Sequence, residues 1–370
     1  MEFTVSRADL VRELNLSQGV VEKKTTIPIL SNVLVEADGD RIHLTATDLE
    51  LGIRCSCAAR VKKAGAGTIP ARRLLDYVRL LPDADVQVKV LENHWANLVC
   101  GRSKTRIAGM SRESFPELPE MPETLAEIPI SVLNAMITKT VFAISSEESR
   151  FTLNGALLVL RKGGLVMVAT DGHRLAMVES SGELSGVTGA YRALLPRKAM
   201  LELQKLAGDS EADAIVRFSG DENHLFFQLG DRLLLSRKLT GNFPDYERVL
   251  PKDQPHSITL QREEFRAAIE RVAQFSDERS RAIRVRAGDG EVKIHSSVSE
   301  TGESEESIPV PYQGPAVEIG FNAQYMLEFL RAIQDDQVSF LFKDPHSAGE
   351  LRPGGEKAET YRYVIMPMRI

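Results

Sequence analysis

Residues 69–83 read IPARRLLDYVRLLPD, and similar stretches occur at residues 195–209, LPRKAMLELQKLAGD, and 321–336, FNAQYMLEFLRAIQDD. Each stretch has the pattern of a helix that ends near an aspartate. The three aspartates, Asp83, Asp209 and Asp335, are equally spaced along the chain. Self-similarity at a fixed interval indicates a duplicated structural unit. We therefore predict the same helix in three successive repeats. Pro70 and Pro196 suit the first turn of two of them, where a missing N–H costs nothing.

A second, amphipathic helix is predicted near the start of each repeat, beginning at Ser6, Ser131 and Gln261. In the first copy, Leu10 and Leu14 share one face, which is the helical period. A serine hydroxyl can accept a hydrogen bond from a free backbone N–H at a helix start, so Ser6 and Ser131 are expected to be N-caps. Each repeat therefore supplies two helices.

Between the helices lie runs rich in β-branched residues, at residues 29–56, 153–180 and 283–300. Each run has the pattern of a strand, a turn containing glycine and a second strand. Proline-bearing stretches, FPELPE from Phe115 and FPDYERVLP from Phe243, follow the first two repeats. We predict an α+β fold of three repeated domains, each with two helices packed on antiparallel sheet. The predicted domains span residues 1–124, 125–252 and 253–370.

The composition is that of an ordinary globular protein. Of 370 residues, 43% are hydrophobic and 26% charged, without a low-complexity run, so disorder is not expected. The N-terminal segment carries scattered charges and no run of about 18 apolar residues occurs, which predicts no signal peptide, no membrane span and a cytoplasmic protein. Cys55, Cys57 and Cys100 form neither an even disulfide set nor a C-x-x-C pair, so reduced, mostly buried thiols are expected.

Cations recur in register on the duplicated helices. Arg79, Lys205 and Arg331 occupy one position, and Arg72 and Lys198 match seven residues earlier on the same face. Because the net charge is -6, contact with DNA would require cations concentrated on one surface. In-register cations could form such a surface, which binds phosphates without reading bases. The alternative is a solvated helix face balanced by the acids Asp76, Glu202 and Glu328.

The densest polar cluster is TDGHR, at residues 170–174. As an enzyme site, it would use His173 as a general base oriented by Asp171, with Arg174 binding an anion. Against this, the first repeat contains ATDLEL from Ala46, which keeps the Thr-Asp pair without the histidine. The pair is therefore expected to hold a turn or a strand end. We predict the wall of a binding pocket here, with a buried structural histidine as the second interpretation.

Signatures of catalysis and metal binding are missing from the sequence. Phosphate-loop, zinc-protease, serine-hydrolase and dinucleotide-binding motifs do not occur, and no two of the seven histidines have metal-ligand spacing. We predict no catalytic residue, no metal and no cofactor. Two competing hypotheses are a hydrolase centred on Asp171 and His173, and a DNA-binding protein that does not encircle DNA.

The three repeats, with TDGHRLA, FPDYERVLP, RFTLNG from Arg150 and the closing VIMPMRI, resemble the bacterial DNA sliding clamps, the β subunits of the DNA polymerase III holoenzyme. The resemblance covers the whole chain. It implies three clamp domains forming half of a ring, a homodimer that encircles duplex DNA, and a processivity factor of replication that is not an enzyme. It also implies a hydrophobic pocket between domains 2 and 3 that binds short peptides of polymerases, the clamp loader and repair proteins.

The resemblance places site residues by matching motif positions. The implied pocket residues are Arg150, Thr152, Leu153, Thr170, Gly172, His173, Arg174, Leu175, Pro244, Val249, Val364, Ile365, Met366, Pro367, Met368 and Arg369. The predicted DNA-facing residues, which the charge pattern also favours, are Lys24, Arg72, Arg79, Lys198, Lys205 and Arg248. Within the pocket, Gly172 is expected to let the backbone approach a ligand, and His173 and Arg174 to offer donors at the rim.

Opposite charges mark two distant segments, the basic GRSKTR at residues 101–106 and the acidic SETGESEES at residues 299–307. Complementary charge suggests head-to-tail association of two copies, although two unrelated solvated loops are the alternative. The predicted interface residues are Arg102, Lys104, Thr105, Arg106, Ile107, Gln274, Phe275, Glu300, Glu303, Glu305 and Glu306. Ile107 and Phe275 are expected to matter most. Thr105 and Gln274 replace residues that are usually apolar in the family, which predicts a more polar and weaker dimer.

Overall fold

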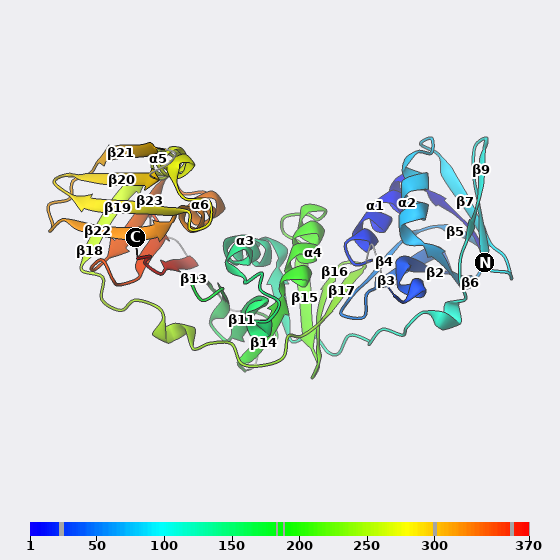
Figure 1. The fold of residues 1–370 in the computed structure, drawn as a ribbon. Coiled ribbons are helices and arrows are strands. Elements are labelled where there is room, and N and C mark those ends of the chain that lie inside the picture. The colour runs from blue at the N-terminus through cyan, green and yellow to red at the C-terminus, as the bar shows by residue number, and fades with distance from the viewer. Residues whose placement is uncertain (22–25, 183, 188, 299–301, 356–358, 370) are drawn as a thin grey trace. The chain divides into compact units, whose positions relative to one another are not determined.

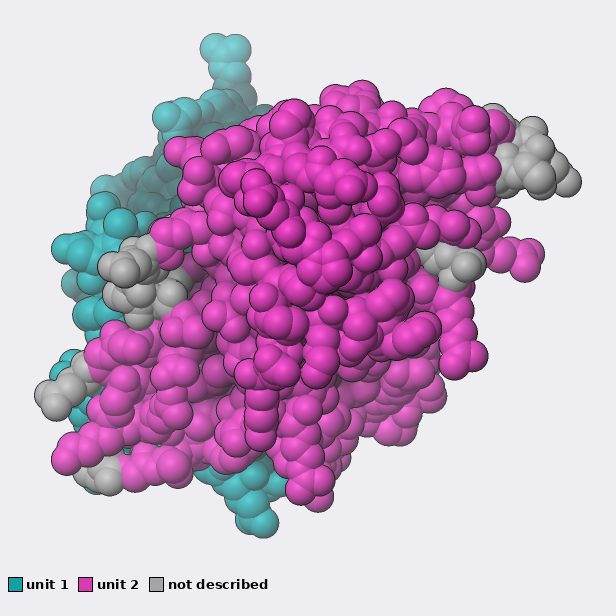
Figure 2. Space-filling view, turned by 90° about the vertical axis from the view of Figure 1, so that its left-hand side faces the viewer, with its two compact units in different colours: residues 1–134, 184–186, 198–238 teal, residues 135–183, 187–197, 239–370 magenta. Residues whose placement is uncertain are grey.

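The computed structural model describes residues 1–21, 26–182, 184–187, 189–298, 302–355 and 359–369. They form two compact units, which Figure 2 distinguishes by colour. Unit 1 contains residues 1–134, 184–186 and 198–238, and unit 2 contains residues 135–183, 187–197 and 239–370. The middle third of the chain therefore contributes to both units.

Unit 1 is built on two antiparallel sheets (Figure 1). The first has the order β5-β1-β7-β8-β9, with strands Arg60–Lys63, Glu2–Ser6, Asp85–Val90, Trp95–Cys100 and Ser103–Ala108. The second has the order β10-β15-β16-β17-β4-β3-β2-β6, with strands Ala126–Pro129, Ile215–Gly220, His224–Leu229, Arg232–Arg237, Leu51–Ala58, Arg41–Thr47, Asn32–Asp38 and Gly65–Pro70.

Helices α1 (Arg7–Gln18) and α2 (Ala71–Arg79) pack against each other in unit 1. Their buried leucines, among them Leu10, Leu14 and Leu74, join one apolar core with side chains of the strands. Burying a leucine fully contributes roughly 1.5–3 kcal/mol. The apolar faces predicted from the sequence thus hold these helices on the sheets.

Unit 2 also contains two antiparallel sheets. The larger has the order β14-β11-β12-β13-β25-β24-β23-β18, with strands Tyr191–Pro196, Gly155–Arg161, Gly164–Thr170, Arg174–Ser181, Glu359–Ile365, Gly349–Pro353, Gln337–Phe342 and His256–Gln261. The smaller has the order β21-β20-β19-β22, with strands Gly302–Pro309, Glu291–Val298, Ala282–Gly288 and Val317–Asn322. Helices α5 (Arg262–Val272) and α6 (Ala323–Ala332) pack together, and α5 contacts β20 and β21.

In the part of the chain that the structure describes, the remaining helices are α3 (Ile130–Thr140), α4 (Arg197–Gly208) and six short 3-10 turns at Pro28–Ser31, Arg112–Ser114, Val141–Ala143, Phe151–Leu153, Tyr246–Arg248 and Ala273–Phe275. The α+β class and all six predicted helices are confirmed. Ser6 occupies the N-cap position of α1, as predicted, but its side chain makes no capping hydrogen bond. The predicted N-cap Ser131 is wrong, because this residue lies inside α3. Pro70 and Pro196 close the strands that precede α2 and α4, just outside the first turn.

Each eight-stranded sheet joins segments from two different repeats. In unit 1, β17 pairs with β4, and in unit 2, β13 pairs with β25. The first junction also holds Glu13, which is 2% exposed and accepts hydrogen bonds from Arg232 at 2.9 and 3.0 Å and from Arg12 at 2.8 Å. Burial alone would favour the neutral carboxyl, but these hydrogen bonds outweigh it, so the pKa of Glu13 is lowered.

The three cysteines are buried and free, as predicted. Burial raises the pKa of the Cys57 thiol to about 12, which keeps it in the unreactive neutral form. Among the helices that the structure describes, none is long and apolar enough to cross a membrane.

Candidate peptide-binding site

The segment TDGHR forms a tight turn between β12 and β13. Asp171 Oδ1 accepts hydrogen bonds from the backbone N–H groups of His173 and Arg174, at 2.9 and 3.0 Å. Thr170 Oγ1 accepts from Gly172 N–H at 3.1 Å and donates to the Arg174 carbonyl at 2.6 Å. Gly172 has a φ of 89°, a conformation that favours glycine. The Thr-Asp pair therefore holds the turn, as predicted.

A sister turn with the same hydrogen bonds connects β3 and β4 in unit 1. Asp48 Oδ1 accepts from the N–H groups of Glu50 and Leu51, at 2.9 and 2.6 Å. Thr47 Oγ1 accepts from Leu49 N–H and donates to the Leu51 carbonyl, both at 2.9 Å. Leu49 takes the place of Gly172 and has a φ of 78°. This second occurrence, without a histidine, confirms that the motif is architectural.

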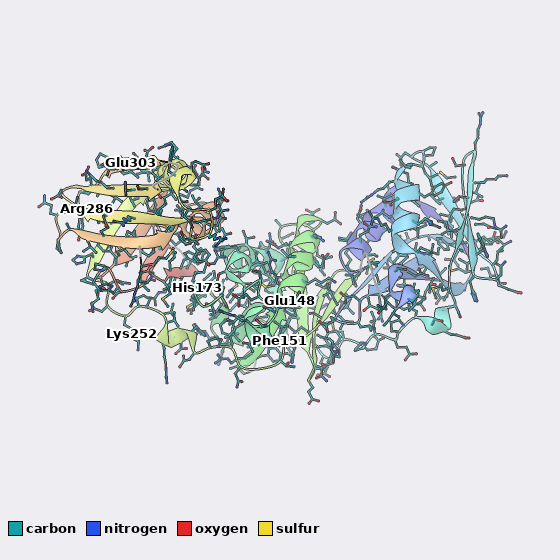
Figure 3. All side chains as sticks on the ribbon, in the orientation of Figure 1. Glu148, Phe151, His173, Lys252, Arg286 and Glu303 are labelled. Atoms are coloured by element: carbon teal, nitrogen blue, oxygen red, sulfur yellow. The ribbon has the colours of Figure 1, made fainter. Side chains whose placement is uncertain are left out.

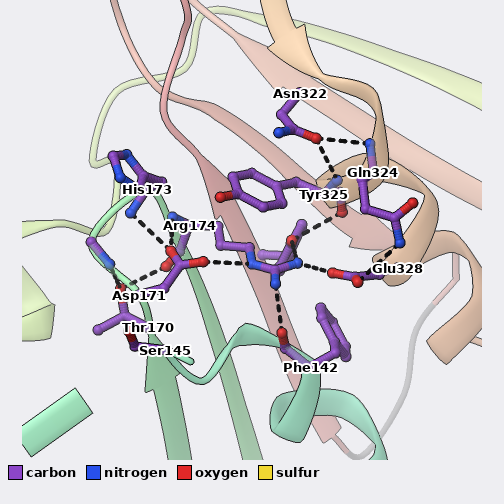
Figure 4. Close-up of polar contacts among 12 residues, drawn as sticks. Phe142, Ser145, Thr170, Asp171, His173, Arg174, Asn322, Gln324, Tyr325 and Glu328 are labelled. Atoms are coloured by element: carbon purple, nitrogen blue, oxygen red, sulfur yellow. Dashed lines mark hydrogen bonds and ion pairs between the residues drawn. The ribbon is translucent and has the colours of Figure 1, made fainter. Parts of the chain in front are cut away.

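Arg174 is the centre of a buried polar network in unit 2 (Figure 4). Its guanidinium is 8% exposed, pairs with Asp171 at 3.1 Å and with Glu328 of α6, and donates to the Phe142 carbonyl at 2.6 Å. The rings of Tyr325 and Phe142 lie 4.2 and 5.6 Å from its carbon Cζ. Arg174 thereby ties the turn to α6 and to the 3-10 turn Val141–Ala143 that follows α3, and it is not the rim donor that we expected.

The electrostatics of this network favour a permanently charged guanidinium. Burial alone would lower the pKa of Arg174, but the hydroxyl of Tyr363 and the carboxylate of Glu328 more than compensate, so the pKa is raised. A charged group held in this way is costly to leave unpaired. Arg174 is therefore suited to fixing the turn's position rather than to exchanging protons.

An apolar cavity of about 110 Å³ opens beside the turn. Its lining residues are Leu153, Thr170, Gly172, Arg174, Leu175, Pro244, Tyr246, Val249, Val364 and Met366. A cavity of ~150 Å³ lined by aliphatic and aromatic side chains is enough to bind benzene. This cavity, called the apolar cavity below, thus has the size and lining for one apolar side chain of a ligand.

Nine of the sixteen implied pocket residues line the apolar cavity, and the sequence reading missed Tyr246. The sequence contained a signal for Tyr246, because this residue lies in FPDYERVLP between the predicted pocket residues Pro244 and Val249. His173 is exposed and does not line the cavity, so neither the rim donor nor the buried histidine is confirmed (Figure 3). Ile365 is 2% exposed and pairs with Arg174 in the ladder of β25 and β13.

The other implied pocket residues lie nearby or line a different hollow. Arg150 donates to the Asp171 carbonyl at 2.9 Å, and the Thr152 methyl group packs beside Gly241. Pro367, Met368 and Arg369 do not line the apolar cavity. They line a separate concavity of about 460 Å³, together with Arg284, Glu318, Gly320, Pro345 and His346.

The predicted DNA-facing cations that the structure describes are exposed and have local partners. Lys24 lies outside the described residues. In the others, the pairs are Arg72 with Asp76 at 3.8 Å, Arg79 with Asn15, Lys198 with Asp48, Lys205 with Glu202 at 2.6 Å and Arg248 with Asp245 at 2.8 Å. Two of the acids named in the alternative interpretation, Asp76 and Glu202, are thus paired with these cations. Glu328 instead serves Arg174.

The predicted interface residues gather on two edge strands. Lys104, Thr105, Arg106 and Ile107 belong to β9, which follows Arg102 and ends its sheet, and Glu303, Glu305 and Glu306 belong to β21, which ends another. Arg106 lies over the Trp95 ring at 4.9 Å, whereas Glu306 pairs with Arg271 at 2.6 Å. Gln274 and the 37%-exposed Phe275 follow α5. Glu300 lies outside the described residues.

Ile107 does not have the role that we expected. It is 3% exposed and belongs to the core of unit 1, because it alternates with the exposed Arg106 and points to the other face of β9. Its side chain therefore offers no apolar surface to a partner.

Within the described residues, no group of histidine, cysteine and acidic side chains is arranged to hold a metal ion.

Comparisons with known proteins cover the whole chain. Family models described as the N-terminal, central and C-terminal domains of the DNA polymerase III beta subunit match residues 1–119, 127–245 and 247–369. The beta sliding clamps of Pseudomonas putida and Caulobacter vibrioides are each 36% identical, over 100% of both chains.

Solved structures give the same result. A DnaN sliding clamp from Pseudomonas aeruginosa, bound to griselimycin, is similar with a TM-score of 0.94 and 36% identity, covering 100% of both chains. The DNA polymerase sliding clamp of Bacillus subtilis is similar with a TM-score of 0.94 and 26% identity, covering 100% of this chain and 99% of that one.

Proposed function

The chain belongs to the family of DNA polymerase III β subunits, the bacterial sliding clamps, and from this premise we propose that two copies close into a ring around duplex DNA. The family acts in DNA replication as a processivity factor, binds DNA and DNA polymerase III, and is not enzymatic. The hydrolase hypothesis is therefore set aside. We further propose that polymerases and other partners, including the clamp loader and repair proteins, bind the apolar cavity through short peptides.

The apolar cavity is the single observation that carries the peptide proposal. Leu153, Leu175 and Val364 supply its apolar walls, and Met366 at its edge is 37% exposed. A methionine side chain repacks readily, which suits a site that accepts several partner sequences. The expected ligand is a short extended peptide with a glutamine near its start and bulky apolar residues at its end, as the resemblance implies.

The edge strands β9 and β21 support the proposed dimer. Among the described residues, the ladders use only one side of each strand, so the backbone groups on the other side can pair with another copy. The exposed side chains of Lys104 and Arg106 on β9 complement Glu303 and Glu305 on β21. Exposed charge pairs contribute only ~0–1 kcal/mol each, so backbone pairing and Phe275 are expected to carry more of the interaction.

Contact with DNA is proposed to be electrostatic and not sequence-specific. The exposed cations Arg72, Arg79, Lys198, Lys205 and Arg248 would contact phosphates through counterion release, so direct affinity for a short duplex should be weak and should fall with salt. The domain boundaries at residues 124 and 252 and the cytoplasmic location also stay predictions.

Calorimetry with the expected peptide tests the pocket. Met366→Ala should weaken binding roughly ten- to hundredfold, because deleting an apolar anchor contact costs ~1–3 kcal/mol. Leu80→Ala, which truncates an 85%-exposed leucine of unit 1, is the matched control and should bind as the parent does. Equal affinity in the Met366→Ala variant and the control would disprove the pocket.

Retention on DNA tests encirclement. The protein, loaded onto nicked circular DNA, should stay bound, and linearising the DNA should release it because a ring can slide off a free end. Equal retention on both forms would favour the non-encircling alternative.

Sedimentation tests the dimer. Phe275→Asp should yield monomers, whereas Ile107→Asp should unfold unit 1, since it buries a charge in the core.

A further inference from the structure

The five-stranded sheet of unit 1 has a core face and an outer face. The core face carries apolar side chains that pack in one cluster with those of α1 and α2, among them Phe3, Val88 and Leu98. Because side chains alternate along a strand, the residues between them point the other way, to the outer face. These residues are exposed or half-buried, so within the described parts of the chain the outer face is open to solvent.

The outer face has an excess of positive charge, although the net charge of the whole chain is -6. Among the described residues on its strands, five exposed cations stand against the carboxylates of Glu2 and Asp85. Lys62 and Lys89 share Glu2, at 2.8 and 3.5 Å, and Arg60 pairs with Asp85 at 2.6 Å. The five cations are Arg60, Lys62, Lys89, Lys104 and Arg106. The outer face therefore suits an anionic partner.

An aromatic ring and a guanidinium are stacked on the same face. Trp95 of β8 is 38% exposed and is the only tryptophan of the chain. The guanidinium carbon of Arg106 lies 4.9 Å from the centre of the Trp95 ring. Because Arg106 belongs to β9, the stack directs its guanidinium over β8 and away from the open edge, where Lys104 is left for the proposed dimer. Aromatic rings and guanidinium planes are the surfaces on which unpaired bases stack.

A hydrogen-bonding group beside this stack lacks a partner. Asn97 pairs in register with Lys89 on one side and with Arg106 on the other. Within the described residues, the side-chain oxygen of Asn97 is buried and has no hydrogen-bond partner. An unpaired buried acceptor costs stability, and a ligand that brings an N–H donor relieves that cost. Bases carry such donors on their edges, whereas the carboxylates of an acidic peptide only accept.

We propose that the outer face binds single-stranded nucleic acid without reading its sequence. Phosphates contact Arg60, Lys62 and Lys89, and a base stacks on the pair formed by Trp95 and Arg106. Three strand spacings, roughly 14 Å, separate β5 from β8, so a short single strand reaches both. Duplex DNA keeps its bases paired and stacked, so it offers this face only its phosphates. The site is distinct from the apolar cavity and from the helix cations proposed to face duplex DNA.

Quenching of Trp95 fluorescence tests the proposal, because no other tryptophan contributes to the signal. A single strand of about ten thymidines, within the ~4–16 nucleotides that single-strand-binding folds cover, should quench the full-length protein to saturation. The affinity should fall as salt rises, since phosphate contacts release counterions. A hairpin duplex with the same number of phosphates should bind roughly tenfold more weakly by this signal. Equal quenching by the two would overturn the proposal.

Two variants locate the site, measured with a fluorescent label on the oligonucleotide. Trp95→Ala should weaken binding about five- to hundredfold, which is the usual effect of losing one base stack. Lys89→Glu should weaken it roughly tenfold, because it replaces a phosphate contact with a repulsion. Lys89 is 57% exposed, so its reversal leaves the sheet folded. The matched control is Lys162→Glu, at an exposed lysine in the turn after β11 in unit 2, which should bind as the parent does.

The results that contradict the site are also defined. Unchanged affinity in Lys89→Glu, or the same loss in Lys162→Glu, would mean that the single strand binds elsewhere. An acidic peptide is the competing partner for a basic face, and a glutamate-rich peptide of equal charge should bind more weakly, because it has no bases to stack. If that peptide binds as tightly as the single strand, the outer face binds acidic protein and the proposal is wrong.

Discussion

The two Thr-Asp turns share one backbone pattern but have different surroundings. In unit 2, Leu175 follows the turn and lines an open cavity. In unit 1, the corresponding residue is Gly52, and a Cβ built there would lie 3.0 Å from Leu118 and 3.1 Å from Leu235. Leu118 and Leu235 thus fill the space that a side chain would take at Gly52. The turn itself does not make a binding site; the neighbouring side chains decide whether one remains.

The aspartates of the two turns are also paired differently. Asp171 is paired with Arg174, which belongs to the same turn, is 8% exposed and also pairs with Glu328. Asp48 is paired with Lys198 of α4, which is 44% exposed. The turn in unit 2 is thus locked by a buried network, whereas the turn in unit 1 has one partly exposed ion pair. The predictions below test how far these differences matter.

Removal of the buried cation should have the largest effect. Arg174→Ala leaves the carboxylates of Asp171 and Glu328 without their partner, and losing one member of a buried pair typically costs about 3–5 kcal/mol. Lys198→Ala should cost less than about 1 kcal/mol, because its pair is partly exposed. Denaturant unfolding of both variants measures the difference. Similar losses would mean that the two turns are held alike.

Filling the space beside Gly52 should be the next most damaging change. Gly52→Leu places a side chain against Leu118 and Leu235, and overpacking of this kind costs about 1–3 kcal/mol. Leu118→Ala in the same chain should recover part of the loss, because it vacates the space. Thermal unfolding of the two single variants and the double variant checks this. A purely additive double variant would show that Leu118 does not fill the space.

Exchanging the residues at the third position of the turns should have a smaller effect. Gly172→Ala should destabilise by about 1 kcal/mol, since a side chain at positive φ costs about 1–2 kcal/mol and the lost chain freedom returns part of it. A Cβ at Gly172 would also lie 3.1 Å from Arg150. Leu49→Gly should be close to neutral. Glycine removes the cost of a positive φ, but it also gives the unfolded chain more conformational freedom to lose on folding. Urea midpoints at matched slopes provide the measurement, and a strong loss in Leu49→Gly would contradict this account.

Low pH should destabilise the junction at which β17 pairs with β4, because Glu13 becomes protonated there. Its pKa is lower in the folded chain than in the unfolded chain, so its contribution is fully present above the unfolded pKa and is lost as pH falls through the folded pKa. Glu13→Gln should therefore be less stable than the parent at neutral pH, and the gap should narrow below about pH 4. Unfolding curves at several pH values measure the gap; a constant gap would exclude this role for Glu13.

The sequence predicted the duplicated parts well because periodicity and repeat spacing are local signals. It placed Thr170, Leu175 and Val364 at one site only through the family resemblance. The role of Arg174 was missed because its partner Glu328 lies on α6, far along the chain, and no local pattern links the two. The burial of Ile107 was missed, although the sequence contained a signal for it. In KTRIA (residues 104–108), Ile107 alternates with the charged Lys104 and Arg106, which places it on the opposite face of the strand.

The length of the two inter-repeat ladders has a consequence for hydrogen exchange. The ladder of β17 and β4 aligns four residue pairs, from Leu233 with Arg54 to Ser236 with Leu51, whereas that of β13 and β25 aligns seven. Amide protons in a short ladder need a smaller opening to reach solvent. Deuterium should therefore enter Leu233–Ser236 before it enters the centre of β13. The two sheets have the same number of strands but should differ in how long their amide protons are protected from exchange.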